Sequence, residues 1–336
     1  MVAEFAILES AGAARGAVSD FRSYGAAAEN ARGKQAVIRI ESHRHRPQGG
    51  CSLDRKERRG FGGCRSSLLK RIALILAGGA GTRLRPLSSD DNPKQFLRIF
   101  DGQSLLQKTY ARAERFAQSI YISTNEQYAA KCLEQLGRVN LLTEPARRNT
   151  GPAIAFCCFE IEQREGECVI AVLPSDHFIG DEDEFVRVIE HAFAFAGSND
   201  HLVTIGIEPT EANTGYGYLQ LDGEIAPGVI RLERFTEKPS RERAESFLRA
   251  GNYAWNAGIF VWRASVFRRT LQEQAPQIAA VTLKNYETMP SISIDYALME
   301  KAPRVAAICG DFRWSDVGSF ESLERVGVNV AALLKT

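Results

Sequence analysis

The chain has 336 residues, of which 44% are hydrophobic and 25% charged, enough apolar material for one large core or two small ones. Its formal net charge of +1 gives no bulk attraction to nucleic acid or to an anionic membrane, so neither is expected as a partner. The charge is uneven, because residues 1–70 carry 13 Lys and Arg against 7 Asp and Glu, which leaves 29 against 34 for the remainder.

The cysteines and the hydropathy pattern indicate a cytoplasmic protein. The seven cysteines are an odd number without regular spacing, which favours reduced thiols over a disulfide scaffold. No apolar stretch approaches the ~20 residues that a membrane helix needs. The start, MVAEFAILES, lacks the basic and apolar regions of a secretory signal, so no export is expected.

Residues 1–70 form a basic arm that we expect to be disordered or loosely attached. They are rich in Gly, Ala, Ser and Arg and lack apolar periodicity. A zinc site is disfavoured, because the gap of thirteen between Cys51 and Cys64 matches no common ligand spacing. Contact with nucleic acid or an acidic partner, an organelle address, and a true translation start near Leu69 stay open as alternatives.

From Arg71 to Pro209 apolar runs alternate with amphipathic segments. Ser104 is a plausible N-cap, and acidic residues occupy the first turn of the segment that begins at Asp181, as the helix dipole favours. This alternation predicts a mostly parallel sheet with helices on both faces. The expected strands are 71–77, 119–124, 139–143, 168–174 and 201–207, and the expected helices are 104–116, 125–136, 151–165 and 181–196.

After Pro209 the pattern changes to shorter strands and turns. NTGYGYLQL, VIRLERFTEKP and WNAGIFVWR read as strands of a smaller mixed sheet over a pocket, with helices near 240–250 and 264–274. The chain shows no internal repeat and no Pro-rich linker beyond residue 70. We therefore expect one α/β domain at 71–325, followed by a tail at 326–336.

The loop GGAGTR, residues 78–83, follows the first expected strand, where open parallel sheets bind ligands. Its glycines permit positive φ angles and a close approach of backbone N–H groups to an anion. A P-loop is excluded because Gly81 is followed by Thr82 and Arg83 instead of a Lys-Ser/Thr pair. A dinucleotide-binding loop is excluded because Leu84 stands where its third glycine belongs, so an NAD-dependent oxidoreductase is not expected.

Two cations and two carboxylates add chemistry to this loop. Arg83 can form a forked contact with pyrophosphate oxygens, and Lys94 follows the stiff Pro93. Asp176 comes just after an expected strand and Asp316 lies in a turn far along the chain. Each aspartate alone is more simply a turn or cap residue, but the two together suit Mg²⁺.

Other polar segments follow strands in the second half of the domain. Asn149 and Thr150, which precede Gly151 and Pro152, are interpreted either as a helix-capping turn or as residues that contact the base and ribose of a nucleotide. Glu237 with Lys238 and Asn256 suit sugar hydroxyls and a phosphate. Asp295 in SIDYALMEK reads as an early-helix charge and not as a catalyst. His177 reads as structural, because Mg²⁺ disfavours imidazole.

Taken in order, these segments resemble the mannose-1-phosphate guanylyltransferases. PKQF and RNT-x-PA favour the mannose and guanine branch over the glucose branches that use thymidine or uridine. The resemblance implies a nucleotide-diphospho-sugar transferase fold that converts GTP and mannose 1-phosphate to GDP-mannose and pyrophosphate, with Mg²⁺. The matching segments are LAGGAGTRLRPLS, PKQFL, EPARRNTGPAIA, VLPSDH, NTGYGYL, FTEKP, WNAGIFVW, SIDYALMEK and WSDVGSF.

The resemblance also implies residue roles. Arg83 would face the departing pyrophosphate and Lys94 the α-phosphate, with Asp176 and Asp316 as metal ligands. The nucleotide would contact Gly78, Gly79, Gly81, Thr82, Glu144, Arg148, Asn149 and Thr150. The sugar phosphate would contact Gly217, Glu237, Lys238 and Asn256.

The chain departs from the family pattern at several places. Arg85 stands where members usually have Trp, Gly151 replaces a usual Ala, and SSDDNPK is more acidic than the usual linker. Long members add a sugar-isomerase domain and many continue into a small β-helix. Because the sequence ends at Thr336, isomerase activity is not expected, and a homodimer is a possible assembly that the missing β-helix would weaken. A transferase for another nucleotide or sugar, and a non-catalytic nucleotide-sugar sensor, remain as alternatives.

Overall fold

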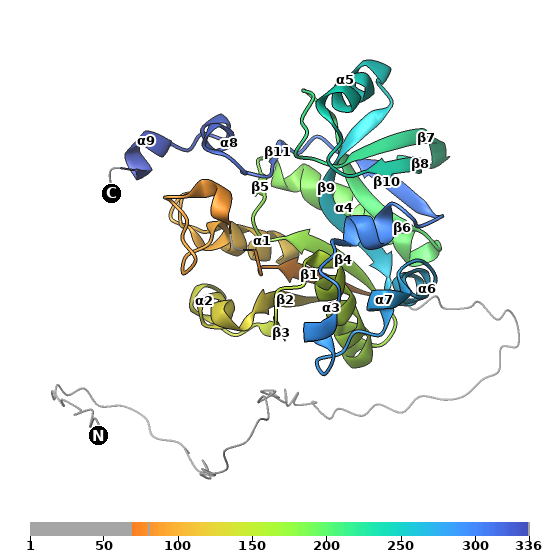
Figure 1. The fold of residues 1–336 in the computed structure, drawn as a ribbon, viewed down its shortest axis with the longest axis horizontal. Coiled ribbons are helices and arrows are strands. Elements are labelled where there is room, and N and C mark those ends of the chain that lie inside the picture. The colour runs from red at the N-terminus through yellow and green to blue at the C-terminus, as the bar shows by residue number, and fades with distance from the viewer. Residues whose placement is uncertain (1–68, 80, 335–336) are drawn as a thin grey trace, which may run out of the picture. The chain divides into compact units, whose positions relative to one another are not determined.

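The computed structural model describes residues 69–79 and 81–334, without the side chain of Thr82. The expectations for the basic arm therefore fall, up to residue 68, outside the described residues. The expected α/β class is confirmed (Figure 1). In the described part of the chain, no helix has the length and apolar character needed to cross a membrane.

The first half alternates strands and helices as predicted. Each observed boundary lies within about two residues of the expected one, and Ser104 caps its helix in a reciprocal capping box with Gln107. The elements are β1 (Lys70–Leu76), α1 (Leu105–Glu114), β2 (Ser119–Asn125), α2 (Glu126–Leu136), β3 (Asn140–Glu144), α3 (Thr150–Glu165), β4 (Cys168–Pro174), β5 (Phe178–Ile179), α4 (Glu182–Ser198) and β6 (Leu202–Ile207). Two 3₁₀ turns, Thr82–Leu84 and Lys94–Phe96, follow β1.

The second half contains strands of varied length, whose pairings are both parallel and antiparallel. They are β7 (Tyr218–Ala226), β8 (Val229–Thr236), β9 (Tyr253–Arg263), β10 (Val305–Cys309) and β11 (Trp314–Ser315). The helices are α5 (Arg241–Ala250), α6 (Ala264–Gln274), α7 (Pro276–Ala279), α8 (Phe320–Arg325) and α9 (Val330–Leu333), with a 3₁₀ turn at Tyr286–Thr288 and a π-helical turn at Asp295–Met299.

One nine-stranded sheet joins the two halves, in the order β3-β2-β1-β4-β9-β6-β10-β8-β7. Strands β1 to β4 pair in parallel, whereas β9 runs antiparallel between β4 and β6. The mixed strands expected after Pro209 thus continue the main sheet instead of forming a separate one. The reason is the length of β9, which pairs with β7 at its start, with β6 from Trp255 to Val261, and with β4 from Phe260 to its end.

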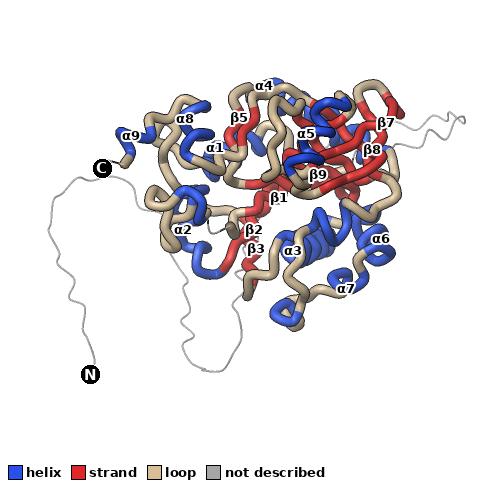
Figure 2. The backbone as a smooth tube through the Cα atoms, turned by 45° about the horizontal axis from the view of Figure 1, so that its top comes forward, coloured by secondary structure: helices blue, strands red, loops and turns tan. Residues whose placement is uncertain are grey.

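Helices cover both faces of this sheet, as the alternation predicts (Figure 2). Successive side chains of β1 point to opposite faces, so Ile72 and Leu74 enter one apolar cluster and Ala73 and Ile75 enter the other. The first cluster includes α3, α6 and α7, with Cys157 and Cys158 buried as expected. The second includes α1, α2 and α4. Burial on both faces explains why these strands read as continuous apolar runs.

Strand register brings distant loops together at one edge of the sheet. Leu76 at the end of β1 pairs with Pro174 at the end of β4, so the glycine loop lies beside Ser175 and Asp176. Asn125 at the end of β2 pairs with Glu144 at the end of β3. A second small sheet pairs β11 with β5, which brings the segment before Asp316 against the segment after Asp176.

Candidate active site

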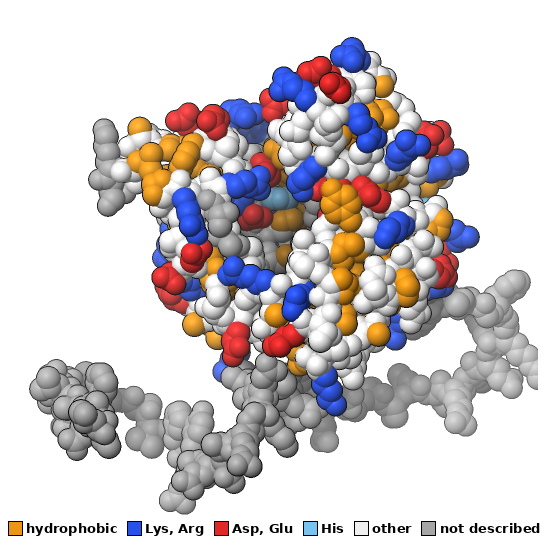
Figure 3. All heavy atoms as spheres, viewed as in Figure 1, with side chains coloured by type: hydrophobic (Ala, Val, Ile, Leu, Met, Phe, Trp, Pro, Cys, Tyr) orange, Lys and Arg blue, Asp and Glu red, His pale blue; other side chains and the backbone are white. Residues whose placement is uncertain are grey.

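A pocket of about 500 Å³ opens where these strands end. Figure 3 shows the face that is hollowed there, with acidic and basic side chains and a histidine in the hollow. Among the predicted site residues whose side chains the structure describes, all line this pocket except Gly81 and Lys238. The lining residues are Gly78, Gly79, Arg83, Lys94, Glu144, Arg148, Asn149, Thr150, Asp176, Gly217, Glu237, Asn256 and Asp316.

The glycine loop is held by side chains that bind its carbonyl groups. Gln95 Nε2 donates to the carbonyls of Ala77 and Gly79, at 3.0 and 2.8 Å, and Ser88 Oγ donates to that of Gly81 at 2.6 Å. Because a trans peptide turns its N–H opposite to its C=O, the Gly78 N–H points away from Gln95. The loop is thus fixed by contacts on its carbonyl side, and anion binding by the N–H side remains a proposal.

Gly81 has a packing role that the sequence pattern does not indicate. Its φ angle is +61°, and a Cβ there would come within 2.6 Å of the Lys94 backbone nitrogen. Only glycine allows both this conformation and this approach without strain. Gly81 therefore seats the 3₁₀ turn that carries Lys94.

Lys94 is buried, only 3% exposed, and bridges two loops that are far apart in sequence. Its Nζ lies 2.9 Å from Asp176 Oδ2 and donates to the carbonyl of Asp316 at 2.6 Å. Burial alone would raise the pKa of Asp176, but Lys94 beside it holds that pKa below its ordinary value. Lys94 is therefore a fixed charge in the pocket lining and not a surface lysine.

Arg83 is more exposed and faces the other carboxylate. Its Nη1 lies 3.7 Å from Asp316 Oδ2, and a Cβ on Gly318 would come within 2.9 Å of that Nη1. Asp316 Oδ1 accepts from Tyr216 Oη at 2.9 Å and from the Gly318 N–H at 3.2 Å. One carboxylate oxygen is thus fixed by protein donors, while the other faces the cation.

His177 is held in one orientation behind Asp176. Trp314 Nε1 donates to His177 Nδ1 at 3.1 Å, which leaves the proton of the neutral ring on Nε2, 4.0 Å from Asp176 Oδ1. Burial lowers the pKa of His177 to about 4, although Asp176 opposes the shift. The imidazole is therefore uncharged at neutral pH, consistent with the structural role predicted for it.

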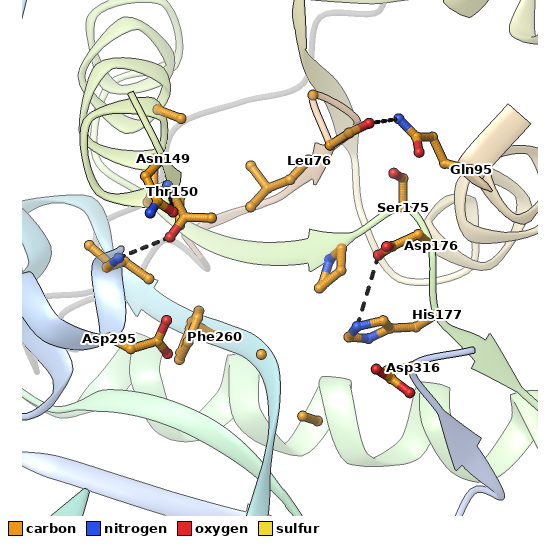
Figure 4. A pocket seen from close by; sticks show the side chains of 18 of the residues that line it. Leu76, Gln95, Asn149, Thr150, Ser175, Asp176, His177, Phe260, Asp295 and Asp316 are labelled. Atoms are coloured by element: carbon orange, nitrogen blue, oxygen red, sulfur yellow. Dashed lines mark hydrogen bonds and ion pairs between the residues drawn. The ribbon is translucent and has the colours of Figure 1, made fainter. Parts of the chain in front are cut away.

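The two aspartates have the donor chemistry that Mg²⁺ uses. Figure 4 shows Asp176, His177 and Asp316 together on one side of the pocket. In the described part of the chain no three His, Cys, Asp or Glu side chains cluster as a complete metal cage. Mg²⁺ at phosphate sites needs only one or two carboxylates, because water and phosphate oxygens supply the rest. Asp176 and Asp316 therefore fit that ion.

Glu144 lies among neutral donors near the glycine loop. Its carboxylate accepts from Ser123 Oγ at 2.7 Å and from Tyr286 Oη at 2.8 Å, and burial raises its pKa although both donors lower it. Asn125, which sequence reasoning missed, also lines the pocket, and its buried Oδ1 accepts no hydrogen bond from the residues that the structure describes. Its place at the end of β2, opposite Glu144, is the signal that points to it.

The Arg-Asn-Thr segment forms the start of α3. Asn149 has a φ angle of +66°, and its side chain accepts from the Thr150 N–H at 2.8 Å, so the capping interpretation of this turn is confirmed. Arg148 donates to the carbonyl of Glu287. Thr150 Oγ1 accepts from the Ile294 N–H at 2.9 Å. The same residues line the pocket, so capping and substrate contact are compatible.

Glu237 and Asn256 form a further wall. A Cβ on Gly217 would come within 2.6 Å of Glu237 Oε2, so a glycine here leaves room for the Glu237 carboxylate. Lys238 Nζ donates to Glu237 Oε1 at 2.5 Å, but its side chain is 59% exposed and is not part of the pocket lining. Of this Glu-Lys pair, only the carboxylate reaches the cavity.

Asp295 also lines the pocket, which the early-helix interpretation did not anticipate. It begins the π-helical turn, as expected for a charge at a helix start, but its Oδ1 accepts from Asn256 Nδ2 at 3.2 Å. Burial and the nearby Glu237 raise its pKa to about 7. Tyr216 and Trp314 are further lining residues that the strand pattern alone did not single out.

The structure explains two of the departures from the family pattern, Arg85 and Gly151. Arg85 pairs with Asp90 in the unusually acidic linker, at the surface, so its charge is not directed into the pocket. The replacement of the usual Ala by Gly151 has a steric consequence, because a Cβ there would come within 2.6 Å of the Ile292 carbonyl oxygen. That carbonyl accepts from the Gly151 N–H at 2.9 Å, so glycine permits a close contact between α3 and the segment before Asp295.

The fold and the pocket define a class of protein. A family model for nucleotidyl transferases matches residues 72–332. The chain therefore belongs to the nucleotidyl transferase family, and its fold is that of this family.

Individual members of this family and related structures are similar to the chain. The chain is 40% identical over 275 residues to the xanthan biosynthesis protein XanB of Xanthomonas campestris pv. campestris, covering 75% of this chain and 58% of that protein. It is 38% identical over 282 residues to the mannose-1-phosphate guanylyltransferase of Sinorhizobium fredii, covering 76% and 55%. A structure of the mannose-1-phosphate geranyltransferase from Thermus thermophilus has a TM-score of 0.72 and 34% identity, covering 77% of this chain and 79% of that one. The chain thus spans 55 to 58% of the length of these two curated relatives.

Proposed function

We propose that the chain is a mannose-1-phosphate guanylyltransferase, which makes GDP-mannose and pyrophosphate from GTP and mannose 1-phosphate. The observation that carries the proposal is the buried Lys94, which joins Asp176 to the Asp316 loop inside the pocket that also contains the glycine loop and Asn256. The choice of guanine and mannose is supported by the names of the relatives with 36 to 38% identity.

The proposed reaction is an in-line attack by a phosphate oxygen of the sugar 1-phosphate on the α-phosphorus of GTP. A P–O bond forms there as the bond to pyrophosphate breaks. The attacking phosphate is already ionised at pH 7, because its second pKa is near ~6, so no general base is needed. The difficulty is the approach of two polyanions, which charge neutralisation and alignment overcome.

The residues have distinct roles in this scheme. Lys94 faces the α-phosphate, Arg83 faces the departing pyrophosphate, and the N–H groups of the glycine loop contact phosphate oxygens. Asp176 and Asp316 would hold Mg²⁺, which supplies further charge neutralisation when bound. Glu144 and the Arg148–Thr150 segment face the nucleoside, and Glu237 and Asn256 face the sugar.

A pyrophosphate-release assay on the full-length chain tests the proposal. We expect turnover with GTP, mannose 1-phosphate and Mg²⁺ that exceeds the turnover with ATP, UTP or dTTP, and with glucose 1-phosphate, by about 10-fold or more. Faster turnover with another nucleotide or sugar would support the nucleotidyltransferase class but contradict the proposed substrates. No pyrophosphate with any pair, alongside measurable binding of GDP-mannose, would favour the sensor alternative.

A further inference from the structure

Asp295 lies where the wall formed by Glu237 and Asn256 meets the segment that is attached to the start of α3. We propose that Asp295 is a sugar-binding residue whose carboxylate accepts a hydrogen bond from a ring hydroxyl of the sugar 1-phosphate. The inference rests on the proposed function, since it takes a sugar phosphate as the occupant of this side of the pocket.

The orientation of the Asn256 side chain determines which hydrogen-bonding groups face this part of the pocket. Its Oδ1 accepts from Thr204 Oγ1 at 2.9 Å and from the Gly258 N–H at 3.1 Å. Because a backbone N–H can only donate, these contacts define the orientation of the amide and turn its Nδ2 towards Asp295. The pair therefore offers an amide donor beside a carboxylate acceptor, and a hydroxyl group can satisfy both.

Asp295 is held in place from two sides. The preceding Ile294 donates its N–H to Thr150 Oγ1, and the Ile292 carbonyl accepts from the Gly151 N–H. The π-helical turn is closed by the Glu300 N–H, which donates to the Asp295 carbonyl at 3.0 Å. Such turns are frequent at functional sites. Figure 4 shows Asp295 on the same side of the pocket as Thr150, across from Asp316.

The charges around Asp295 favour a neutral ligand group over an anion. Glu237 faces it from the end of β8 and repels further negative charge, while Lys238, Ser293 and Asn256 partly offset the cost of its carboxylate. In the described part of the chain no Lys or Arg forms an ion pair with Asp295, in contrast to Asp176, which pairs with Lys94. Two neighbouring carboxylates suit hydroxyl donors and disfavour a phosphate.

The test uses the full-length chain, mannose 1-phosphate and its monodeoxy analogues. We expect Asp295→Asn to raise KM for mannose 1-phosphate by about 10-fold or more, as the loss of a charge-assisted hydrogen bond implies, with KM for GTP changed less than about 3-fold. One monodeoxy analogue, which lacks the hydroxyl that Asp295 contacts, should bind the wild type about as weakly as mannose 1-phosphate binds Asp295→Asn. For this analogue, the substitution should raise KM little further. Asp222→Asn, an exposed carboxylate on β7, is the matched control.

The pH dependence supplies a second readout. The carboxylate is the accepting form, so the ratio of KM between Asp295→Asn and wild type should be larger at pH 8 than at pH 6, where Asp295 is mostly protonated. Ionisation of the sugar phosphate affects both proteins and cancels in the ratio.

The outcomes separate the inference from the function on which it rests. An unchanged KM for mannose 1-phosphate in Asp295→Asn, with active wild type, overturns the inference alone. A rise confined to KM for GTP overturns it as well, because the ribose is then the group that Asp295 contacts. If the variant does not fold, a wild type that binds every monodeoxy analogue as well as mannose 1-phosphate overturns it. If the wild type turns over no sugar 1-phosphate, the function and the inference both fail.

Discussion

The pocket contains aspartates in two places with opposite electrostatic surroundings. On the side of the pocket where we propose that the phosphates bind, Asp176 touches Lys94 and Asp316 faces Arg83, and the pKa of Asp176 is held below its ordinary value. On the opposite side Asp295 lies beside Glu237, and no described Lys or Arg forms an ion pair with it; burial and Glu237 raise its pKa to about 7. We propose that these surroundings select opposite ligands, because a centre of paired charges suits polyanions and a wall of like charges suits neutral hydroxyls.

The largest effect is expected for Lys94→Ala. This substitution removes the fixed cation between the two aspartate loops, and kcat should fall by about 10²-fold or more, as for the loss of one preorganised charge contact. Steady-state pyrophosphate release measures it. Lys284→Ala, an exposed lysine outside the pocket, is the control. Near-normal turnover in a folded Lys94→Ala protein would remove Lys94 from its proposed role.

Asp176→Asn and Asp316→Asn test the metal assignment. Each variant keeps the side-chain shape but loses a negative charge, so half-maximal activity should require about 10-fold more Mg²⁺ or more. A titration of turnover against Mg²⁺ concentration measures the shift. An unchanged Mg²⁺ requirement in both variants would contradict a shared metal site.

The stability of Asp295→Asn should depend on pH in a defined direction. The carboxylate has a folded-state pKa of about 7 against roughly 3.9 in the unfolded chain, so it costs nothing below about pH 4 and costs most above about pH 7. The variant should therefore melt about 2 °C or more above wild type at pH 8 and at nearly the same temperature at pH 4. Thermal unfolding at both pH values measures this. An equal difference at both would show that Asp295 titrates normally.

The smallest effect is expected for Arg85→Ala. Its guanidinium pairs with Asp90 at the surface, and exposed ion pairs contribute only about 0–1 kcal/mol. Both kcat and KM should stay within about 2-fold of wild type in the pyrophosphate assay. A larger rise in KM for GTP would place Arg85 at the phosphates after all.

The sequence predicts the proposed phosphate-binding residues better than the residues on the side of the pocket that contains Asp295. Arg83 follows the glycine loop and Asp176 follows an expected strand, and parallel strands bring their carboxyl ends to one edge. Lys94 after Pro93 and Asp316 in its turn owe their predicted roles to the family resemblance. The interpretation of Asp295 as an early-helix charge is confirmed, but its position in the pocket lining was not predicted, because it follows no strand. Its place in the pocket depends on hydrogen bonds to Thr150 and Gly151, which are about 140 residues away, and no local pattern encodes such a contact.

A similar limit applies to the sheet. The strand at 255–263 was expected, but its antiparallel insertion between β4 and β6 depends on pairing partners that local periodicity does not specify. Likewise, Gly81 was expected to contact phosphates, whereas its positive φ and the nearby Lys94 show that it also has to seat the lysine.

Kinetic comparison of Lys94→Ala and Asp295→Asn, side by side with GTP, mannose 1-phosphate and Mg²⁺, tests the division between the two walls most directly. The account predicts that Lys94→Ala lowers kcat with a small change in KM for mannose 1-phosphate. It predicts that Asp295→Asn raises that KM with a small change in kcat. Losses in the same parameter for both variants would contradict the account.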